Sequence, residues 1–240
     1  MFNVLNSRSV EAEYMDDFSS GGEELLEALQ HLRRLNRIFA AAGPLLHGIK
    51  ELWIRSGKPK RLHVMDIGAG SGELNRHILR WADRMGIDIE ITLVDVTEEA
   101  CIEARKIFID EPRVRAVRQD VFDLEKASAD MLISSQFLHH FNDDELLEVT
   151  RQMLKCSRLG IVISDIHRHW ISWSAVWLTA HLISTNRYIR HDGPLSVAKG
   201  FHSSDWKRLS QALSTHGEYK LHYSWKPLFR YSVVIYKYVE

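Results

Sequence analysis

The chain has 240 residues and a formal net charge of -1, because 31 Lys and Arg nearly balance 32 Asp and Glu. Hydrophobic residues make up 45% and charged residues 26%, which is ordinary for a globular chain with a sizeable core. No block of basic residues of the kind that binds nucleic acid is present, so we expect no nucleic-acid partner. The sequence does not open with a basic end followed by an apolar run. We therefore expect no signal peptide and a cytoplasmic location.

The two cysteines, Cys101 and Cys156, fall inside predicted helices and have no metal-ligand spacing. Buried free thiols in a reducing compartment are the expected interpretation. We predict no metal site from the sequence.

The first quarter of the chain has helical spacing and no strand pattern. Within residues 7–55, apolar side chains recur every three or four residues, and Gly43-Pro44 interrupts the run. A second helix is predicted over residues 45–55, followed by a loop at 56–59. This pattern predicts an N-terminal helical cap over residues 1–58, before a core over residues 59–240.

The chain is organised around an apolar strand at residues 61–67 that runs into a glycine turn. Gly68, Gly70 and Gly72 stand at alternate positions, and a helical pattern follows. Glycines let a ligand approach the backbone, and a helix N-terminus offers free N–H groups. A dinucleotide site would have its third glycine where this chain has Glu73. The spacing therefore disfavours an NAD-dependent oxidoreductase.

Strand and helix patterns alternate from residue 61 onward, which predicts an α/β fold with a parallel, doubly wound, Rossmann-like sheet. The predicted strands cover residues 61–67, 89–95, 114–120, 130–134 and 160–165, and a final hairpin covers 221–225 and 231–238. Asn142 and Glu145 have the spacing of a capping box for a helix that ends near Cys156.

A Trp-rich stretch interrupts the alternation after the fifth strand. Trp170, Trp173 and Trp177 fall on one face of a predicted helix over residues 170–185, which is short for a membrane span. We expect no transmembrane segment. That face either packs in the core or forms an aromatic lid over the substrate, within an insertion at about 170–200. Residues 187–200 read as a polar loop.

An acidic residue, Asp66, precedes the glycine turn by two positions. The resulting pattern of acidic-x-Gly-x-Gly-x-Gly resembles motif I of the class I S-adenosylmethionine-dependent methyltransferases. The resemblance implies a seven-stranded sheet whose last strand is antiparallel, helices on both faces, and S-adenosylmethionine as the cofactor. It also implies that the N-terminal helices cover the cofactor and shape the acceptor pocket.

Acidic residues that end the next strands fit the same cofactor. Asp95 lies 23 residues after Gly72, where a carboxylate can accept both ribose hydroxyls, although it could instead cap a turn. The resemblance places Val96 on the adenine face and Asp120 at the adenine amino group. The predicted cofactor-binding residues are Arg37, Asp66, Gly68, Ala69, Gly70, Gly72, Asp95, Val96, Asp120, Val121, Ser135 and Gln136.

Three histidines are candidate general bases, because imidazole titrates near neutral pH. In similar methyltransferases the segment that holds His139 and His140 lines the methionine part of the cofactor and faces the acceptor. Alternatively, one of these histidines caps the following helix and the other packs. His167 is the third candidate, with Asp165 able to orient it, unless Asp165 and Arg168 form a structural ion pair.

A narrower resemblance involves the segments at residues 32–37, 165–168 and 190–196. These look like bacterial methyltransferases that are often encoded beside type III polyketide synthases. That resemblance implies a small-molecule acceptor with a phenolic hydroxyl, in secondary metabolism.

Other interpretations stay open at this point. No Tyr-x-x-x-Lys pair supports a short-chain dehydrogenase, but a non-catalytic cofactor-binding subunit fits the same motifs. A metal-assisted catechol-type enzyme is disfavoured, since Asp165 has no acidic partner close in sequence. The sequence also leaves a homodimer open.

Overall fold

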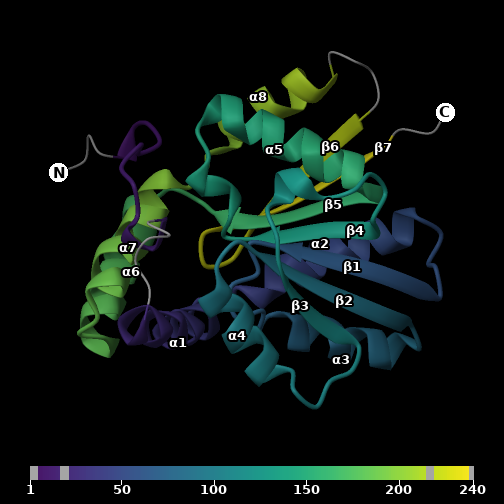
Figure 1. Cartoon of the computed structure of the whole chain (residues 1–240). Helices are drawn as coiled ribbons and strands as arrows, with labels where there is room; N and C mark the ends of the chain where they lie inside the picture. The colour runs from purple at the N-terminus through teal and green to yellow at the C-terminus, as the bar shows by residue number, and fades with distance from the viewer. Residues whose placement is uncertain (1–4, 17–21, 215–218, 238–240) are drawn as a thin grey trace.

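The computed structural model describes residues 5–16, 22–214 and 219–237. One twisted sheet runs through the molecule, with helices on both faces and a further group of helices at one end (Figure 1).

The sheet has seven strands in the order β3-β2-β1-β4-β5-β7-β6. The first five pair in parallel, whereas β7 pairs antiparallel with both β5 and β6. This arrangement confirms the predicted α/β class and the antiparallel last strand. The strands are β1 (Arg61–Ile67), β2 (Asp88–Asp95), β3 (Val114–Arg118), β4 (Ala129–Ser135), β5 (Ser157–Ile166), β6 (Tyr219–Lys226) and β7 (Arg230–Lys237).

The helices alternate with the first five strands and then cluster. They are α1 (Glu23–Ile38), α2 (Ala42–Arg55), α3 (Asn75–Met85), α4 (Glu98–Ile107), α5 (Asp143–Cys156), α6 (Trp170–Ile183), α7 (Arg187–Lys199) and α8 (Ser203–Ser214). Short 3-10 helices occur at η2 (Tyr14–Asp16), η3 (Val121–Asp123) and η4 (Leu138–His140).

Two apolar layers hold the helices against the sheet. Alternate residues of β1 face opposite sides, so Met65 and Ile67 belong to one layer and Leu62 and Val64 to the other. The first layer includes residues of α5 and α8, and the second includes residues of α2, α3 and α4. α2 falls within the N-terminal helical segment, residues 1–58, that the sequence separates from the core, but it packs on the sheet.

Local signals fix several element ends. Asn142 caps α5 with Glu145 in a complete capping box, as predicted. The predicted break between two helices is present but lies at residues 39–41; Gly43 and Pro44 lie in the first turn of α2, where proline needs no intrahelical donor. Both cysteines are buried and free, as expected.

The group of helices at the end of the sheet consists of α1, α6 and α7, which we call the cap (Figure 1). Its own apolar cluster joins Ala28 and Leu35 of α1, Ala180 of α6, and Tyr188 and Ile189 of α7. The cap thus combines two parts of the chain that are about 150 residues apart.

The predicted polar loop at residues 187–200 is wrong, because this segment is helix α7. Asn186 caps its start by accepting a hydrogen bond from the Tyr188 backbone N–H. Polar residues that suggested a loop are buried with partners: Asp192 accepts from the backbone N–H groups of Tyr14 and Met15. Tertiary contacts outweigh the weak local helical signal.

Residues 5–16 form an irregular strap, apart from a short turn at residue 5 and η2. The sequence predicts helix from residue 7, and that prediction is wrong for 7–13; residues 1–4 and 17–21 lie outside the described residues. The strap is anchored by Arg8, whose guanidinium donates to the backbone oxygens of Lys199, His139 and Phe141 and to the carboxylate of Asp143.

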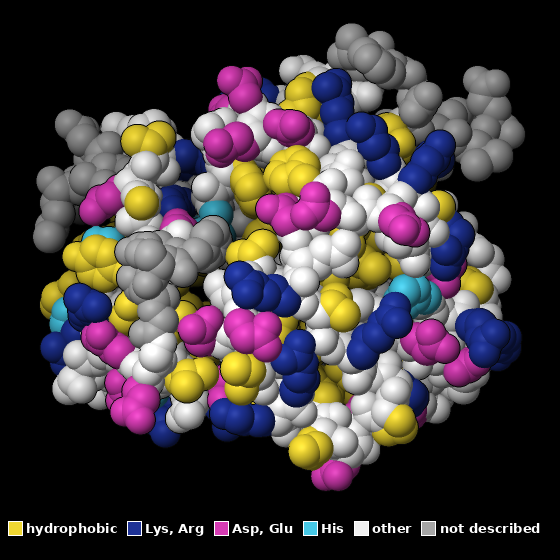
Figure 2. Space-filling model, in the orientation of Figure 1, with side chains coloured by type: hydrophobic (Ala, Val, Ile, Leu, Met, Phe, Trp, Pro, Cys, Tyr) yellow, Lys and Arg dark blue, Asp and Glu magenta, His cyan; other side chains and the backbone are white. Residues whose placement is uncertain are grey.

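The Trp face of α6 does not pack in the core. Trp170 is 52% exposed and Trp177 is 43% exposed, whereas Trp173 is partly buried. Among the described residues, no helix is both long enough and apolar enough to cross a membrane. Figure 2 shows acidic and basic side chains interspersed over the face it presents.

Candidate functional site

A cavity of about 760 Å³ lies between the ends of the strands and the cap. Its walls come from the turns after β1, β2, β3 and β4, from the strap, and from α1 and α7. The predicted cofactor residues that line it are Asp66, Gly68, Ala69, Gly70, Gly72, Asp95, Val96, Asp120, Val121, Ser135 and Gln136.

The glycine turn is shaped for a ligand. Gly68, Gly70 and Gly72 all have positive φ, a conformation that side chains disfavour. A Cβ at Gly68 would collide with the ring of Phe137, but a Cβ at Gly70 would meet no atom within 4 Å. The space beside Gly70 is therefore open for a ligand.

Asp95 is held in position at the end of β2. Its Oδ2 accepts a hydrogen bond from the Gly70 backbone N–H at 2.8 Å, and its Oδ1 accepts from the backbone and side chain of Thr97. Asp95 thus links the glycine turn to the start of α4. The structure shows the capping contacts, and ribose binding by Asp95 stays a prediction that is compatible with them, since a carboxylate has about four acceptor sites.

Asp66 is buried beneath the glycine turn. Its Oδ2 accepts from the Asn75 side chain at 2.6 Å, while its Oδ1 is buried with no hydrogen-bond partner. Burial raises the pKa of Asp66 to about 7, and the Asn75 hydrogen bond opposes that rise. An unpartnered buried carboxylate oxygen fits a donor or cationic group from a bound ligand.

Glu73 occupies the position that distinguishes this turn from a dinucleotide turn. Burial raises its pKa to about 7, opposed by Arg33, whose Nε lies 3.6 Å from the Glu73 carboxylate. Arg33 lines the cavity, whereas the predicted Arg37 is exposed and does not line it. α1 turns Arg33 and Asn36 inward and leaves Arg37 outside.

The turn after β4 ties the cap to the sheet. Gln136 has a positive φ of 54°, and its side-chain amide donates to the Asn36 side chain of α1 at 2.6 Å. A non-glycine residue in this conformation carries strain and is found disproportionately at binding sites. The prediction that Ser135 and Gln136 face the cofactor stays a prediction, but both line the cavity.

His139 and Asp165 form a buried pair. The Nδ1 atom of His139 lies 2.7 Å from Asp165 Oδ1, and the side chains are 2% and 0% exposed. Asp165 also accepts from the backbone N–H groups of Leu138 and Ile166. Burial alone would raise the pKa of Asp165, but the charge and hydrogen bond of His139 outweigh burial and lower it. Asp165 therefore orients His139 rather than His167.

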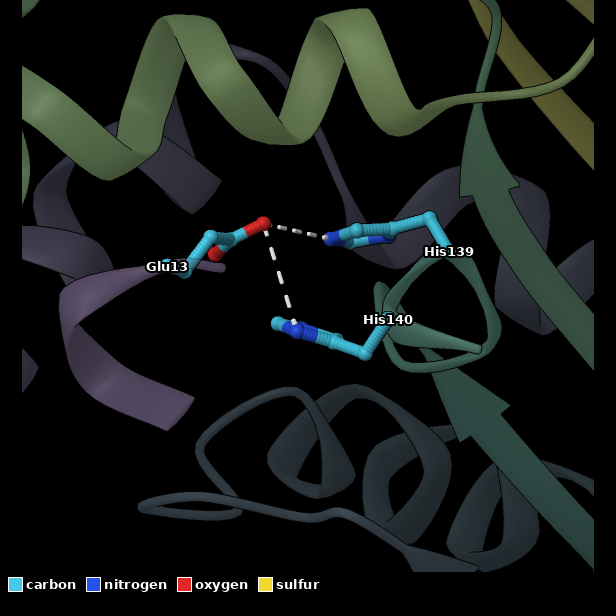
Figure 3. A group of neighbouring side chains, drawn as sticks. All are labelled: Glu13, His139 and His140. Carbon is cyan, nitrogen blue, oxygen red and sulfur yellow. Dashed lines mark ion pairs between the residues drawn. The ribbon is translucent and has the colours of Figure 1, made fainter. Parts of the chain in front are cut away.

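The strap brings acidic residues to the histidines. Glu13 Oε1 lies 3.7 Å from His139 Nε2 and 4.0 Å from His140 Nδ1, as Figure 3 shows. Asp16 Oδ1 lies 2.7 Å from the same His140 Nδ1. Burial alone would lower the pKa of His140, but the Asp16 hydrogen bond and the Glu13 and Asp16 charges outweigh burial and raise it.

Sequence reasoning missed Glu13, Asp16 and Lys199. The Lys199 ammonium lies 3.6 Å from Glu13 Oε1 and 3.2 Å from Asp16 Oδ2. Glu13 and Asp16 stand in a stretch with no motif, and Lys199 is 183 residues from Asp16 in the chain. The one available signal is Lys199, at the end of the segment 187–200 that the sequence predicts as a loop.

His167 lies outside the cavity. Its Nδ1 accepts a hydrogen bond from the Trp225 indole, and its ring contacts His202 and Tyr231. Burial, together with the nearby His202, His169 and Arg168, lowers its pKa to about 4. The structure does not bring His167 together with the other two candidate bases.

Of the two alternatives for the Trp face, the lid alternative does not place the Trp helix α6 on this cavity. Among the described residues, the cavity is lined by Ile189, Asp192, Gly193 and Ser196 of α7 and by none of α6. The insertion does cover the cavity, but through the helix that the sequence assigned to a loop. Arg168 pairs with Asp205 at 3.7 Å, not with Asp165.

Comparison with known proteins agrees with this geometry. Residues 64–160 match the profile of a family described as a methyltransferase domain. No curated protein matches the chain.

Solved structures share the fold at low identity. A putative S-adenosylmethionine-dependent methyltransferase from Methanococcus maripaludis has a TM-score of 0.62 at 17% identity, with 92% of this chain and 97% of that chain covered. The plantazolicin methyltransferase BpumL, in complex with a desmethylplantazolicin analogue and SAH, has a TM-score of 0.65 at 15% identity, with 92% of each chain covered. Human N-acetylserotonin methyltransferase, in complex with SAM, has a TM-score of 0.64 at 14% identity, with 96% of this chain and 64% of that chain covered.

Two of these neighbours are complexes with SAM or SAH, the cofactor and product of the enzyme class that the sequence predicts. Residues 64–160 are thus similar to a methyltransferase domain, and the chain shares its fold with solved S-adenosylmethionine-dependent methyltransferases.

Proposed function

We propose that this protein transfers the methyl group of S-adenosylmethionine to the hydroxyl of a small molecule, a phenolic or polyketide-derived compound. The observation that carries the proposal is the buried His139–Asp165 pair, which faces the same cavity as the glycine turn and Asp95.

The residues present fit the cofactor. Gly70 leaves open space against the backbone, Asp95 offers a fixed carboxylate, and Asp66 has an unpartnered buried oxygen. These three groups would hold the nucleoside and the amino-acid end of the cofactor. When bound, S-adenosylmethionine supplies a sulfonium methyl that an acceptor displaces in line, so positioning of the two reactants contributes much of the rate.

His139 is suited to accept the proton of the acceptor hydroxyl. When its Nδ1–H donates to Asp165, the lone pair of Nε2 faces Glu13 and the cavity. A histidine held in one tautomer by a buried carboxylate can act as a general base near neutral pH. Glu13 and His140 lie beside His139, whose Nε2 atom would take up this proton.

The cavity walls support an apolar acceptor. Leu25 and Leu29 of α1, Ile189 of α7, and the rings of Phe137 and Phe141 line the cavity beside the histidines. Aromatic and aliphatic side chains of this kind suit a flat ring, and the polar groups of the same lining can fix its orientation. The volume of about 760 Å³ is within the range of sites that hold a drug-sized ligand.

A mass-spectrometric screen of phenols with S-adenosylmethionine tests the proposal directly. For an acceptor found in this way, His139→Gln should lower kcat by about 100-fold or more while cofactor affinity stays within about twofold. His167→Gln is the matched control, because that histidine lies outside the cavity, and it should keep the parent kcat. Equal kcat values for parent and His139→Gln would contradict the base role. Cofactor binding with no methylated product over a broad acceptor panel would favour a non-catalytic binding subunit.

A further inference from the structure

We propose that Glu13, His139 and His140 form a binding site for one divalent transition-metal ion at the acceptor end of the cavity. The site is built from the strap on one side and from η4 on the other, as Figure 3 shows. This inference deepens the proposed function and rests on it only for the role of the ion, not for its binding.

The geometry is close to that of a metal site. Glu13 Oε1, His139 Nε2 and His140 Nδ1 all lie within 4.8 Å of one another, and the carboxylate oxygen is 3.7 Å and 4.0 Å from the two nitrogens. An ion about 2.0–2.2 Å from each donor in a tetrahedral arrangement would separate its ligands by about 3.4 Å. The two rings are stacked, with centroids 4.4 Å apart and an angle of 28° between their planes, so closing the site around an ion would require one imidazole to rotate as Glu13 moves closer.

The donor atoms have unsatisfied bonding capacity. The Glu13 and His139 side chains are 4% and 2% exposed, and neither Glu13 Oε1 nor His139 Nε2 has a hydrogen-bond partner among the described residues. A buried polar atom without a hydrogen-bond partner destabilises the folded state. One cation between these atoms would satisfy both.

The surrounding groups already orient the ligands. Asp165 accepts from His139 Nδ1, so the His139 Nε2 lone pair points at Glu13. A carboxylate behind a ligating histidine is the usual arrangement around protein-bound metals. The other oxygen of Glu13 accepts from the Ser196 hydroxyl at 3.1 Å, which fixes the carboxylate from α7.

The charge balance favours a cation. Glu13, Asp16 and Asp165 supply three carboxylates beside the histidines, against the Lys199 ammonium that pairs with Glu13 and Asp16. Asp16 is one-third exposed, so it can turn toward solvent when an ion takes the His140 Nδ1 lone pair.

Two imidazoles and one carboxylate select the class of ion. Calcium and magnesium prefer oxygen ligands, whereas Fe²⁺, Mn²⁺, Co²⁺ and Zn²⁺ accept this mixed set and keep open positions. The open positions would face the cavity, where the ion can hold the acceptor oxygen.

The base role proposed above for His139 Nε2 applies to the metal-free protein; with an ion bound at Nε2, the ion would instead favour loss of the proton from the acceptor hydroxyl. The acceptor O–H proton would leave to water, the oxygen would form the new C–O bond, and the C–S bond would break with its electrons remaining on sulfur. The products are the methyl ether and S-adenosylhomocysteine.

The test is a Co²⁺ titration of the chelator-treated full chain, followed by absorption in the visible range and by equilibrium dialysis. We expect one ion per chain, and at least a tenfold loss of affinity in Glu13→Gln and in His140→Gln. His167→Gln, outside the cavity, should bind Co²⁺ as the parent does. No saturable binding, or parent affinity in Glu13→Gln, would overturn the proposal.

Two further measurements separate this inference from the proposed function. S-adenosylmethionine titration of Glu13→Gln should give the parent affinity, which also reports that the variant is folded. Asp95→Ala, which removes a cofactor residue, should keep Co²⁺ binding. Methylation by a protein that binds no Co²⁺ would reject the metal site alone, whereas Co²⁺ binding without methylation would reject only the proposed function.

Discussion

Asp66 couples the protonation of the cofactor site to stability. Its pKa in the folded protein is about 7, raised by burial, against 3.8 for an ordinary aspartate. Between these values the folded state holds a proton that the unfolded state has lost, so the free energy of unfolding falls as pH rises. The slope approaches about 1.4 kcal/mol per pH unit for one group.

Asp66→Asn resembles the protonated carboxyl and cannot ionise, so it should flatten this decline between about pH 4 and pH 7. Denaturant unfolding of both proteins at several pH values measures the difference. Glu73, with a raised pKa of about 7, contributes to the slope that remains. An identical pH profile in parent and variant would mean that Asp66 is ionised in the folded protein.

Asp95 provides a second residue-scale prediction. Asp95→Ala should weaken S-adenosylmethionine binding by about 2 kcal/mol or more, since charge-assisted hydrogen bonds to the ribose are lost. Calorimetry gives the affinity. Because Asp95 also accepts a hydrogen bond from Gly70, circular dichroism is needed to report whether the substitution disturbs the fold. Unchanged affinity in a folded variant would remove Asp95 from the site.

At the residue scale, a residue that lines the cavity could be predicted when its partners lie close to it in the sequence. Asp66 and the glycines could be predicted because they form one contiguous turn, and Asp95 because it ends the neighbouring strand. Glu13 could not, since its histidine partners are more than 120 residues away. Arg37 failed for another reason: a sequence pattern does not say which face of α1 meets the cavity.

At the scale of elements, we expect the position of the strap at residues 5–16 to affect turnover. Arg8 anchors it through hydrogen bonds to backbone oxygens on both sides of the histidines, with its side chain only 11% exposed. Arg8→Ala should free the strap, because hydrogen bonds from a charged group contribute about 1.5–3 kcal/mol each. We expect kcat/KM for the acceptor to fall about tenfold, with cofactor affinity within about twofold.

Arg61→Ala is the control for loss of charge, because Arg61 pairs with Asp88 on the surface. Steady-state kinetics on both variants makes the comparison. A parent-like kcat/KM in Arg8→Ala would show that the strap position does not matter for turnover.

The tryptophans of α6 and α8 give a prediction about packing. Trp177 is 43% exposed, so Trp177→Ala should change the free energy of unfolding by less than about 1 kcal/mol. Trp206 of α8 is fully buried, and Trp206→Ala should destabilise the fold by about 3–5 kcal/mol. Urea unfolding of the two variants compares them; equal losses would place the Trp177 side chain inside a core.

For the molecule as a whole, the sheet was more predictable than the cap. Each βα unit buries apolar residues within a short stretch, so periodicity in the sequence reports it directly. The cap depends on contacts between α1 and α7, which are far apart in the chain. α7 therefore has the composition of a loop, and only its neighbours make a helix favourable there.

The position of β7 has a consequence for the order of events during synthesis. β7 pairs with β5 over residues 160–166 and separates it from β6. Until β7 leaves the ribosome, the edge of β5 has no partner from this sheet, and seven of its ten residues form a continuous buried run in the finished fold. The parallel half of the molecule can form first, but the nascent chain exposes an unpaired strand edge until residues 230–237 have left the ribosome. Slow translation through the last two strands should therefore lower the yield of native protein more than a pause of equal length earlier in the chain.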